Sequence, residues 1–239
     1  VWIAVQSLAQ RCIFNLAPTI LGIVATSSDI AVFAPATSIE GYFATIASAI
    51  NGFFVMRITK YIVSGEKEQL YQLLLKVGKF QVIYIGFVCV GEEFMCAWMG
   101  ETYKMAWPCA LLVMIPDILI FAEQVANTAA IASNLVKQQA GGYVLMAAIC
   151  VLTSFPLSAK FGAVGAAAAI ALAYMTLFIY NNILYSIKMQ LDMRKFIREC
   201  YGKWILQMVL TTAIGYFLCN HIILISGWKG VIIKAIIVS

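Results

Sequence analysis

Long apolar runs separated by short polar connections make up most of this chain. The runs lie at 1–24, 30–56, 76–98, 105–131, 141–159, 162–187, 203–226 and 230–239. Nearly all have the roughly 20 residues that a helix needs to cross a hydrocarbon core of about 30 Å. They are continuous and lack the alternation of apolar and polar positions that marks the strands of a membrane barrel. The pattern therefore predicts an all-α fold, a polytopic bundle of transmembrane helices.

Basic residues gather on alternate connections. If the first run starts in the cytoplasm, the connections on the opposite side hold only three, Lys104, Lys160 and Lys229. The cytoplasmic connections hold 11, namely Arg57, Lys60, Lys67, Lys76, Lys79, Lys137, Lys188, Arg194, Lys195, Arg198 and Lys203. Membrane proteins carry an excess of Lys and Arg on the cytoplasmic side. The bias supports both this orientation and the number of runs.

The runs divide the chain into three predicted regions. Residues 1–187 contain six runs and predict a six-helix transmembrane lobe. Residues 188–202 predict a basic amphipathic cytoplasmic linker, and residues 203–239 predict two additional transmembrane helices, the last one truncated. The chain starts at Val1 within an apolar run and also ends in one. We therefore expect a longer parent protein, truncated here at both ends.

The composition agrees with a membrane protein. Hydrophobic residues make up 63% of the chain and charged residues 11%, with a mean hydropathy of +0.91, whereas soluble domains carry about 25% charged residues. The net charge of +5 resides in basic linkers that can contact anionic lipid headgroups, so it does not indicate a nucleic acid partner. The seven cysteines are scattered singly, a pattern that predicts neither a disulfide nor a metal site.

Four charged residues lie deep inside the apolar runs, away from the run ends, namely Arg11, Glu40, Asp117 and Glu123. A charge at the bilayer centre costs about 2.5–3.5 kcal/mol on insertion scales, so such residues normally face protein or water. Each has polar neighbours at helical spacing, and Pro116 beside one of the acids predicts a kink. The polar residues that we expect to line a cavity with Arg11 are Asn15, Glu40, Ser48, Asn51 and Gln124.

Two interpretations of these charges stay open. In one, a solvated central cavity uses Arg11 to attract an anionic substrate group, while Asp117 or Glu123 binds a coupling ion, H⁺ or Na⁺. In the other, Arg11 forms an internal ion pair with Glu40 or Asp117 that only orients the helices.

Small residues mark the sixth run, where Gly162, Gly165 and Ala166 precede further alanines. This stretch predicts close helix packing. The sequence contains no phosphate-binding glycine loop, no HExxH and no Ser/His/Asp set. It therefore offers no evidence for catalysis, and we expect neither an enzyme nor a cofactor.

Four motifs follow one another along the chain. They are AWMGETY at 97–103, LVMIPDILIFAEQVANTAAIASN at 112–134, FGAVGAAAAIALAY at 161–174 and NNILYSIKMQLDMRKF at 181–196. Their order and spacing resemble the second half of the polysaccharide flippases, the Wzx-type O-antigen translocases of the MOP (MATE-like) superfamily. The resemblance covers roughly residues 1–205.

The resemblance implies two six-helix lobes facing each other in the bacterial inner membrane, often with two further helices. Such proteins flip undecaprenyl-pyrophosphate-linked oligosaccharides to the periplasmic leaflet for O-antigen, capsule or exopolysaccharide synthesis. Residues 1–187 would be the second lobe, so the implied partners are a missing N-terminal lobe, the lipid-linked oligosaccharide and membrane lipids. Basic cavity residues are thought to meet the pyrophosphate, and Arg11 is the candidate here. Glu123 stands where many relatives carry Gln, which leaves an ion-coupling role open.

Other functions remain as alternatives. The nearest are a lipid II flippase and a multidrug and toxin extrusion antiporter, whose cavity should be acidic and lined by aromatic residues. A membrane enzyme of the same pathway would need a large external catalytic loop, and the outer connections here are short. A structural scaffold would leave the buried charges unexplained.

Overall fold

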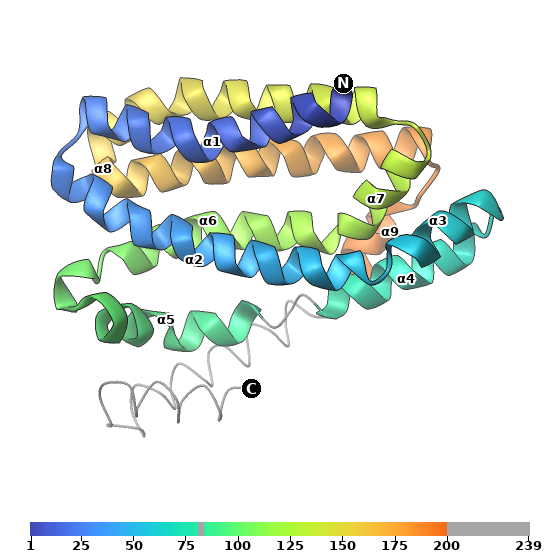
Figure 1. The fold of residues 1–239 in the computed structure, drawn as a ribbon, viewed down its shortest axis with the longest axis horizontal. Coiled ribbons are helices and arrows are strands. Elements are labelled where there is room, and N and C mark those ends of the chain that lie inside the picture. The colour runs from blue at the N-terminus through green and yellow to red at the C-terminus, as the bar shows by residue number, and fades with distance from the viewer. Residues whose placement is uncertain (81–83, 200–239) are drawn as a thin grey trace.

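The computed structural model describes residues 1–80 and 84–199. Every regular element in these ranges is a helix, which confirms the all-α prediction. The helices in Figure 1 are α1 (Trp2–Val24), α2 (Ser27–Gly52), α3 (Val55–Val63), α4 (Lys67–Phe80), α5 (Tyr84–Met99), η2 (Glu101–Tyr103), α6 (Ala106–Ala122), α7 (Gln124–Ala132), α8 (Val136–Lys188) and α9 (Met193–Ile197). The runs predicted at 203–226 and 230–239 lie outside the described residues.

Among the described residues, three helices, α1, α2 and α8, are long and apolar enough to cross a membrane. The bent pair of α6 and α7 would make a fourth span if it is counted as one element. These elements coincide with the runs predicted at 1–24, 30–56, 105–131 and 141–159. The run predicted at 76–98 falls on the end of α4 and on α5, on either side of the undescribed residues 81–83.

The bend in the fourth run does not lie where the proline predicts it. Helix α6 continues through Pro116 and ends at Ala122, and α7 starts at Gln124 with its axis turned by 49°. Glu123 between them leaves the helical conformation, with φ −91° and ψ 3°. The prediction of a kink at Pro116 is therefore wrong in position, because the helix is interrupted at the buried acid seven residues later.

Helix α8 is a helical hairpin rather than one rod (Figure 1). Gly162 has φ 56° and ψ −133°, and this non-helical residue separates an arm at 136–161 from an arm at 163–188. The arms run antiparallel, because the Tyr180 hydroxyl donates to the Gln138 carbonyl oxygen at 2.8 Å. This turn confirms the two separate runs predicted at 141–159 and 162–187.

The small residues at the hairpin, Gly162, Gly165 and Ala166, have different structural roles. A Cβ at Gly162 would collide with the carboxylate of Asp29, whose Oδ1 accepts a hydrogen bond from the Ala163 backbone N–H at 3.2 Å. A Cβ at Gly165 would collide with the backbone carbonyl of Leu157 in the other arm. Close packing is thus confirmed at Gly165 and at the fully buried Ala166, while Gly162 serves mainly to reverse the chain.

The helices form two packed regions. The larger core joins α1, α2, α5, α6 and both arms of α8, with α1 lying on α8 and α2 lying on α6 (Figure 1). The smaller core lies at one end, where α3, α4 and α9 pack against α7 and the end of α8. Many large apolar side chains face outward, including Leu8, Leu152 and Ile187. Such a surface suits an apolar surrounding better than water.

The basic connection that contains α3 and α4 contacts the linker predicted at 188–202 in the smaller core. The Lys67 ammonium donates to the Gln190 side-chain oxygen at 2.9 Å, and the Tyr71 hydroxyl donates to Glu199 Oε2 at 3.2 Å. The Lys195 ammonium lies 5.3 Å from the centre of the Tyr71 ring. In the part of the chain that the structure describes, both segments bury apolar side chains in this core, while basic residues such as Lys60 and Arg194 are exposed.

Candidate functional site

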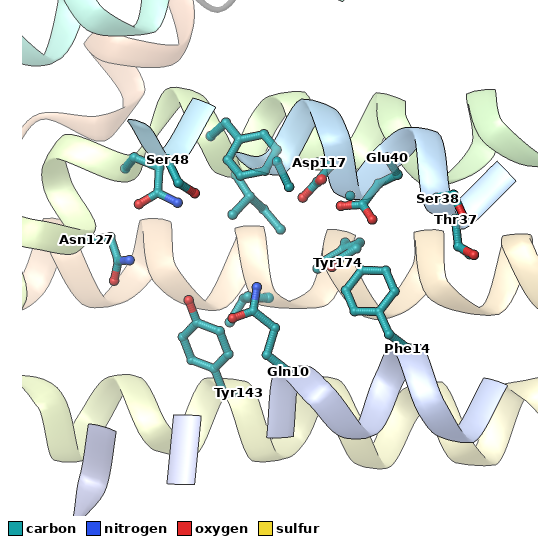
Figure 2. A pocket seen from close by; sticks show the side chains of 16 residues that line it. Gln10, Phe14, Thr37, Ser38, Glu40, Ser48, Asp117, Asn127, Tyr143 and Tyr174 are labelled. Carbon is teal, nitrogen blue, oxygen red and sulfur yellow. The ribbon is translucent and has the colours of Figure 1, made fainter. Parts of the chain in front are cut away.

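A cavity of about 470 Å³ lies between α1, α2, the α6–α7 pair and both arms of α8 (Figure 2). Its lining combines polar and aromatic side chains with a few aliphatic ones. The lining residues are Gln10, Phe14, Thr37, Ser38, Glu40, Gly41, Ala44, Ser48, Asp117, Ile120, Phe121, Gln124, Asn127, Tyr143, Tyr174 and Leu177. A polar cavity inside a bundle with an apolar exterior is the arrangement that an aqueous passage through lipid requires.

The cavity has an exposed rim and a buried floor. Gln10 of α1 and Ser38 and Ser48 of α2 are exposed. The opposite wall carries the buried side chains of Asp117 on α6 and Tyr174 on the second arm of α8. The cavity therefore opens toward the surface formed by α1 and α2 and is closed by the buried residues of α6 and α8.

Two carboxyl groups meet at the floor of the cavity. Glu40 is 4% exposed and Asp117 is 5% exposed, and their side chains are in hydrogen-bonding contact across the α2–α6 interface (Figure 2). Helical spacing explains the placement of Glu40, since Phe33, Ala36 and Ile39 bury the same side of α2. Two negative charges in contact away from water repel each other strongly. The pair can therefore hold a proton or a monovalent cation between its oxygens.

Arg11 does not line this cavity, which corrects the sequence prediction. Its side chain is exposed on α1, and in the described part of the chain it forms no ion pair with Glu40 or Asp117. The reason is helical geometry, because Gln10 and Phe14 point into the cavity and the next position along the helix is rotated by about 100°. The internal ion pair is therefore also wrong.

Asn15 follows Arg11 on the same exposed face of α1. Its side-chain amide donates to the Arg11 carbonyl oxygen at 2.7 Å, and Thr19 donates in turn to the Asn15 carbonyl oxygen at 2.7 Å. Arg11 and Asn15 thus form an exposed polar stripe beside the cavity mouth rather than part of its wall.

The other predicted cavity residues divide into two groups. Ser48 and Gln124 line the cavity. Asn51 is buried beside it, where its amide donates to Thr128 Oγ1 at 3.2 Å and links α2 to α7. The sequence prediction missed Tyr143 and Tyr174, because a tyrosine in an apolar run carries no signal that separates a cavity wall from ordinary core.

Glu123 is buried at the helix break, outside the cavity lining. Its Oε1 accepts a hydrogen bond of 2.5 Å from the Asn182 side-chain amide on the second arm of α8. The structure thus separates the two predicted ion-coupling acids, with Asp117 in the cavity and Glu123 behind it.

Comparison with known proteins adds no family assignment. No family model, no curated protein and no solved structure matches the chain. The geometry of the cavity and the sequence motifs are therefore the basis for a functional proposal.

Proposed function

We propose that this chain is one lobe of a flippase that moves lipid-linked oligosaccharides across the bacterial inner membrane for surface polysaccharide synthesis. The observation that carries the proposal is the polar cavity enclosed by helices with an apolar exterior. The ordered motifs that resemble polysaccharide flippases and the one-sided distribution of basic residues support it. A charged sugar-pyrophosphate head needs a hydrated route, because bare hydrocarbon would impose a large desolvation cost.

In the proposed mechanism, two lobes rock about a passage that opens alternately to each side of the membrane. The exposed stripe with Arg11 and Asn15 on α1 would face a second lobe and form part of that passage. Arg11 would then attract the pyrophosphate as the head group enters. The Glu40–Asp117 pair would take up the coupling proton or cation when the head group leaves. The lipid tail would remain among the apolar side chains outside the bundle.

The expected outcome for Arg11→Ala in the full-length protein is a loss of surface polysaccharide at normal protein level. The variant removes the exposed guanidinium that, in this proposal, attracts the pyrophosphate. Gel analysis of polysaccharide from a deletion strain carrying the variant measures the effect. Lys160→Ala removes an exposed basic residue from the end of the first arm of α8 and serves as the matched control. Normal polysaccharide in the Arg11→Ala strain would remove Arg11 from the mechanism.

One observation favours a second candidate, a cation antiporter of the multidrug and toxin extrusion type. The cavity floor carries two acids and two tyrosines, and none of its lining residues is basic. Carboxylates and aromatic faces bind organic cations. Efflux of ethidium from the same strains separates the candidates, since Glu40→Gln should abolish efflux only if the cavity binds the drug.

A further inference from the structure

Three of the most exposed large apolar side chains among the described residues lie in one short segment around α3. Phe53 is 83% exposed, Met56 is 85% exposed and Val63 is 84% exposed. Helix α3 follows α2 at one end of the bundle and packs beside α4 (Figure 1). Apolar side chains that gather on a surface mark a site of interaction. This segment therefore calls for a partner that covers it.

Helical geometry divides the surface of α3 into strips. Ile58 is fully buried and anchors one side of the helix in the smaller core. Met56 and Val63 are seven residues apart, which places them on one common strip that faces away from Ile58. Arg57 and Lys60 are three residues apart and share a second exposed strip. At about 100° per residue, the centres of the apolar and basic strips lie about 80° apart around the helix.

The basic strip has no acidic counterpart on α3, whose nine residues include neither Asp nor Glu. Within the described part of the chain, neither Arg57 nor Lys60 forms an ion pair. The next acids along the chain, Glu66 and Glu68, follow the turn after α3, and Glu68 accepts a hydrogen bond from the Gln72 amide at 3.0 Å. The helix therefore presents two uncompensated cations directly beside an exposed apolar strip.

We infer that α3 is a docking surface for an anionic phospholipid of the surrounding membrane, with Met56 and Val63 against the acyl chains and Arg57 and Lys60 against the phosphate group. Helices with an apolar side and basic residues beside it bind at the boundary between headgroups and acyl chains, and anionic lipids strengthen that binding. Guanidinium and ammonium groups are the usual partners of phosphate oxygens. The inference requires that the chain lies in a membrane, but it does not depend on the proposed flippase function.

A lipid fits this surface better than a second protein does. The nine residues of α3 make a helix about 13 Å long, whereas a specific protein interface buries about 800 Å² on each partner. The centre of a protein interface is also depleted of charged residues, and here the cations border the apolar strip directly. One phospholipid, with its charge next to its acyl chains, matches both strips at this size.

Quenching of a fluorophore by nitroxide-labelled lipids tests this inference. The full-length protein, with its native cysteines replaced, is labelled at Met56→Cys and reconstituted in phosphatidylcholine vesicles. We expect nitroxide-labelled phosphatidylglycerol to quench more strongly than the same mole fraction of nitroxide-labelled phosphatidylcholine. The expected preference in apparent affinity is about fivefold or more, which is what one cation near an anionic surface provides.

Two double variants show whether the α3 cations cause the preference. Arg57→Gln combined with Lys60→Gln should remove the preference for phosphatidylglycerol and keep the quenching, because the apolar strip is unchanged. Lys104→Gln combined with Lys160→Gln is the matched control. It removes the same number of cations from connections on the opposite predicted side of the membrane, and it should keep the preference.

Three outcomes would overturn the inference. Equal quenching by both lipids without the Gln substitutions would mean that α3 meets lipid but recognises no charge. Quenching by neither lipid would mean that water, a second copy of the chain or another protein covers α3. A preference that survives Arg57→Gln with Lys60→Gln would place the anionic lipid elsewhere. If the label at Met56→Cys prevents folding, Val63→Cys gives the same measurement on the same strip.

Discussion

The carboxyl pair of Glu40 and Asp117 is the most constrained feature at the scale of single residues. The sequence alone predicts that both carboxyl groups lie within the membrane, because both acids stand in apolar runs. It also predicts that they face protein or water, because a charge in hydrocarbon is costly. Their contact with each other depends on how α2 packs on α6 and could not be predicted. One of the two interpretations that the sequence left open paired Arg11 with Glu40 or Asp117 instead.

Asp117→Asn should fold at least as stably as the wild type. The amide is isosteric and removes the repulsion between two acids in contact, while it still hydrogen bonds to Glu40. Thermal unfolding of the purified protein at pH 8 measures this, and Ser38→Ala on the rim is a control outside the pair. A fall of several degrees for Asp117→Asn would show that both charges are needed for folding.

Gly162→Ala should destabilise the protein by about 1–3 kcal/mol, the usual range for a strained backbone residue. The φ of +56° disfavours an L side chain, and the added Cβ would displace the Asp29 carboxylate from the start of the second arm. Gly52→Ala is the matched control, because a Cβ there meets no atom within 4 Å. Equal unfolding temperatures for both variants would contradict the role assigned to the turn.

At the scale of elements, the contact between α4 and α9 joins two linkers that are far apart in sequence. Burial and the negative charge of Glu199 raise the pKa of Tyr71 to about 12, from an ordinary value of 10. A raised pKa means that the neutral phenol is favoured in the folded state. Its contribution to stability is therefore complete below pH 10 and is lost as the pH rises through about 12.

The ultraviolet titration of tyrosine provides a direct check. We expect the difference between the wild type and Tyr71→Phe to show no phenolate absorbance up to pH 10, because Tyr71 keeps its proton and its hydrogen bond to Glu199. Tyr42→Phe is the control, since Tyr42 is 64% exposed. A Tyr71 signal that appears at or below pH 10 would mean that α4 and α9 are not in contact.

Helix positions were more predictable than the interruptions within them. The apolar runs gave the bounds of α1 and α2 to within a few residues, since burial or lipid exposure of a whole helix needs a continuous apolar stretch. The break at Glu123 was assigned to Pro116, because a proline is the local signal for a kink. The actual break accompanies a hydrogen bond to Asn182, a residue 59 positions away in the sequence.

At the scale of the whole molecule, the charge pattern predicts which ends of the bundle share a side. The α3–α4 turn and η2 lie at opposite ends of the bundle (Figure 1). In a protein whose native cysteines are replaced, Ser64→Cys should react with a membrane-impermeant maleimide only after the cells are opened. Thr102→Cys should react in cells whose outer membrane alone is permeable. Both positions are exposed. Labelling of both from the same side would refute the orientation and the predicted lobe.

The sequence by itself determined the helical class, the approximate spans, the charge asymmetry and the presence of acids within apolar runs. These properties follow from local composition, because hydrocarbon-length helices and intramembrane charges are visible in a single stretch of chain. Only the tertiary structure decided that Glu40 meets Asp117, that Arg11 faces outward and that Glu123 is buried against Asn182. Such contacts depend on helix rotation and packing between distant segments, and a rotation of about 100° per residue separates a cavity wall from an exposed face.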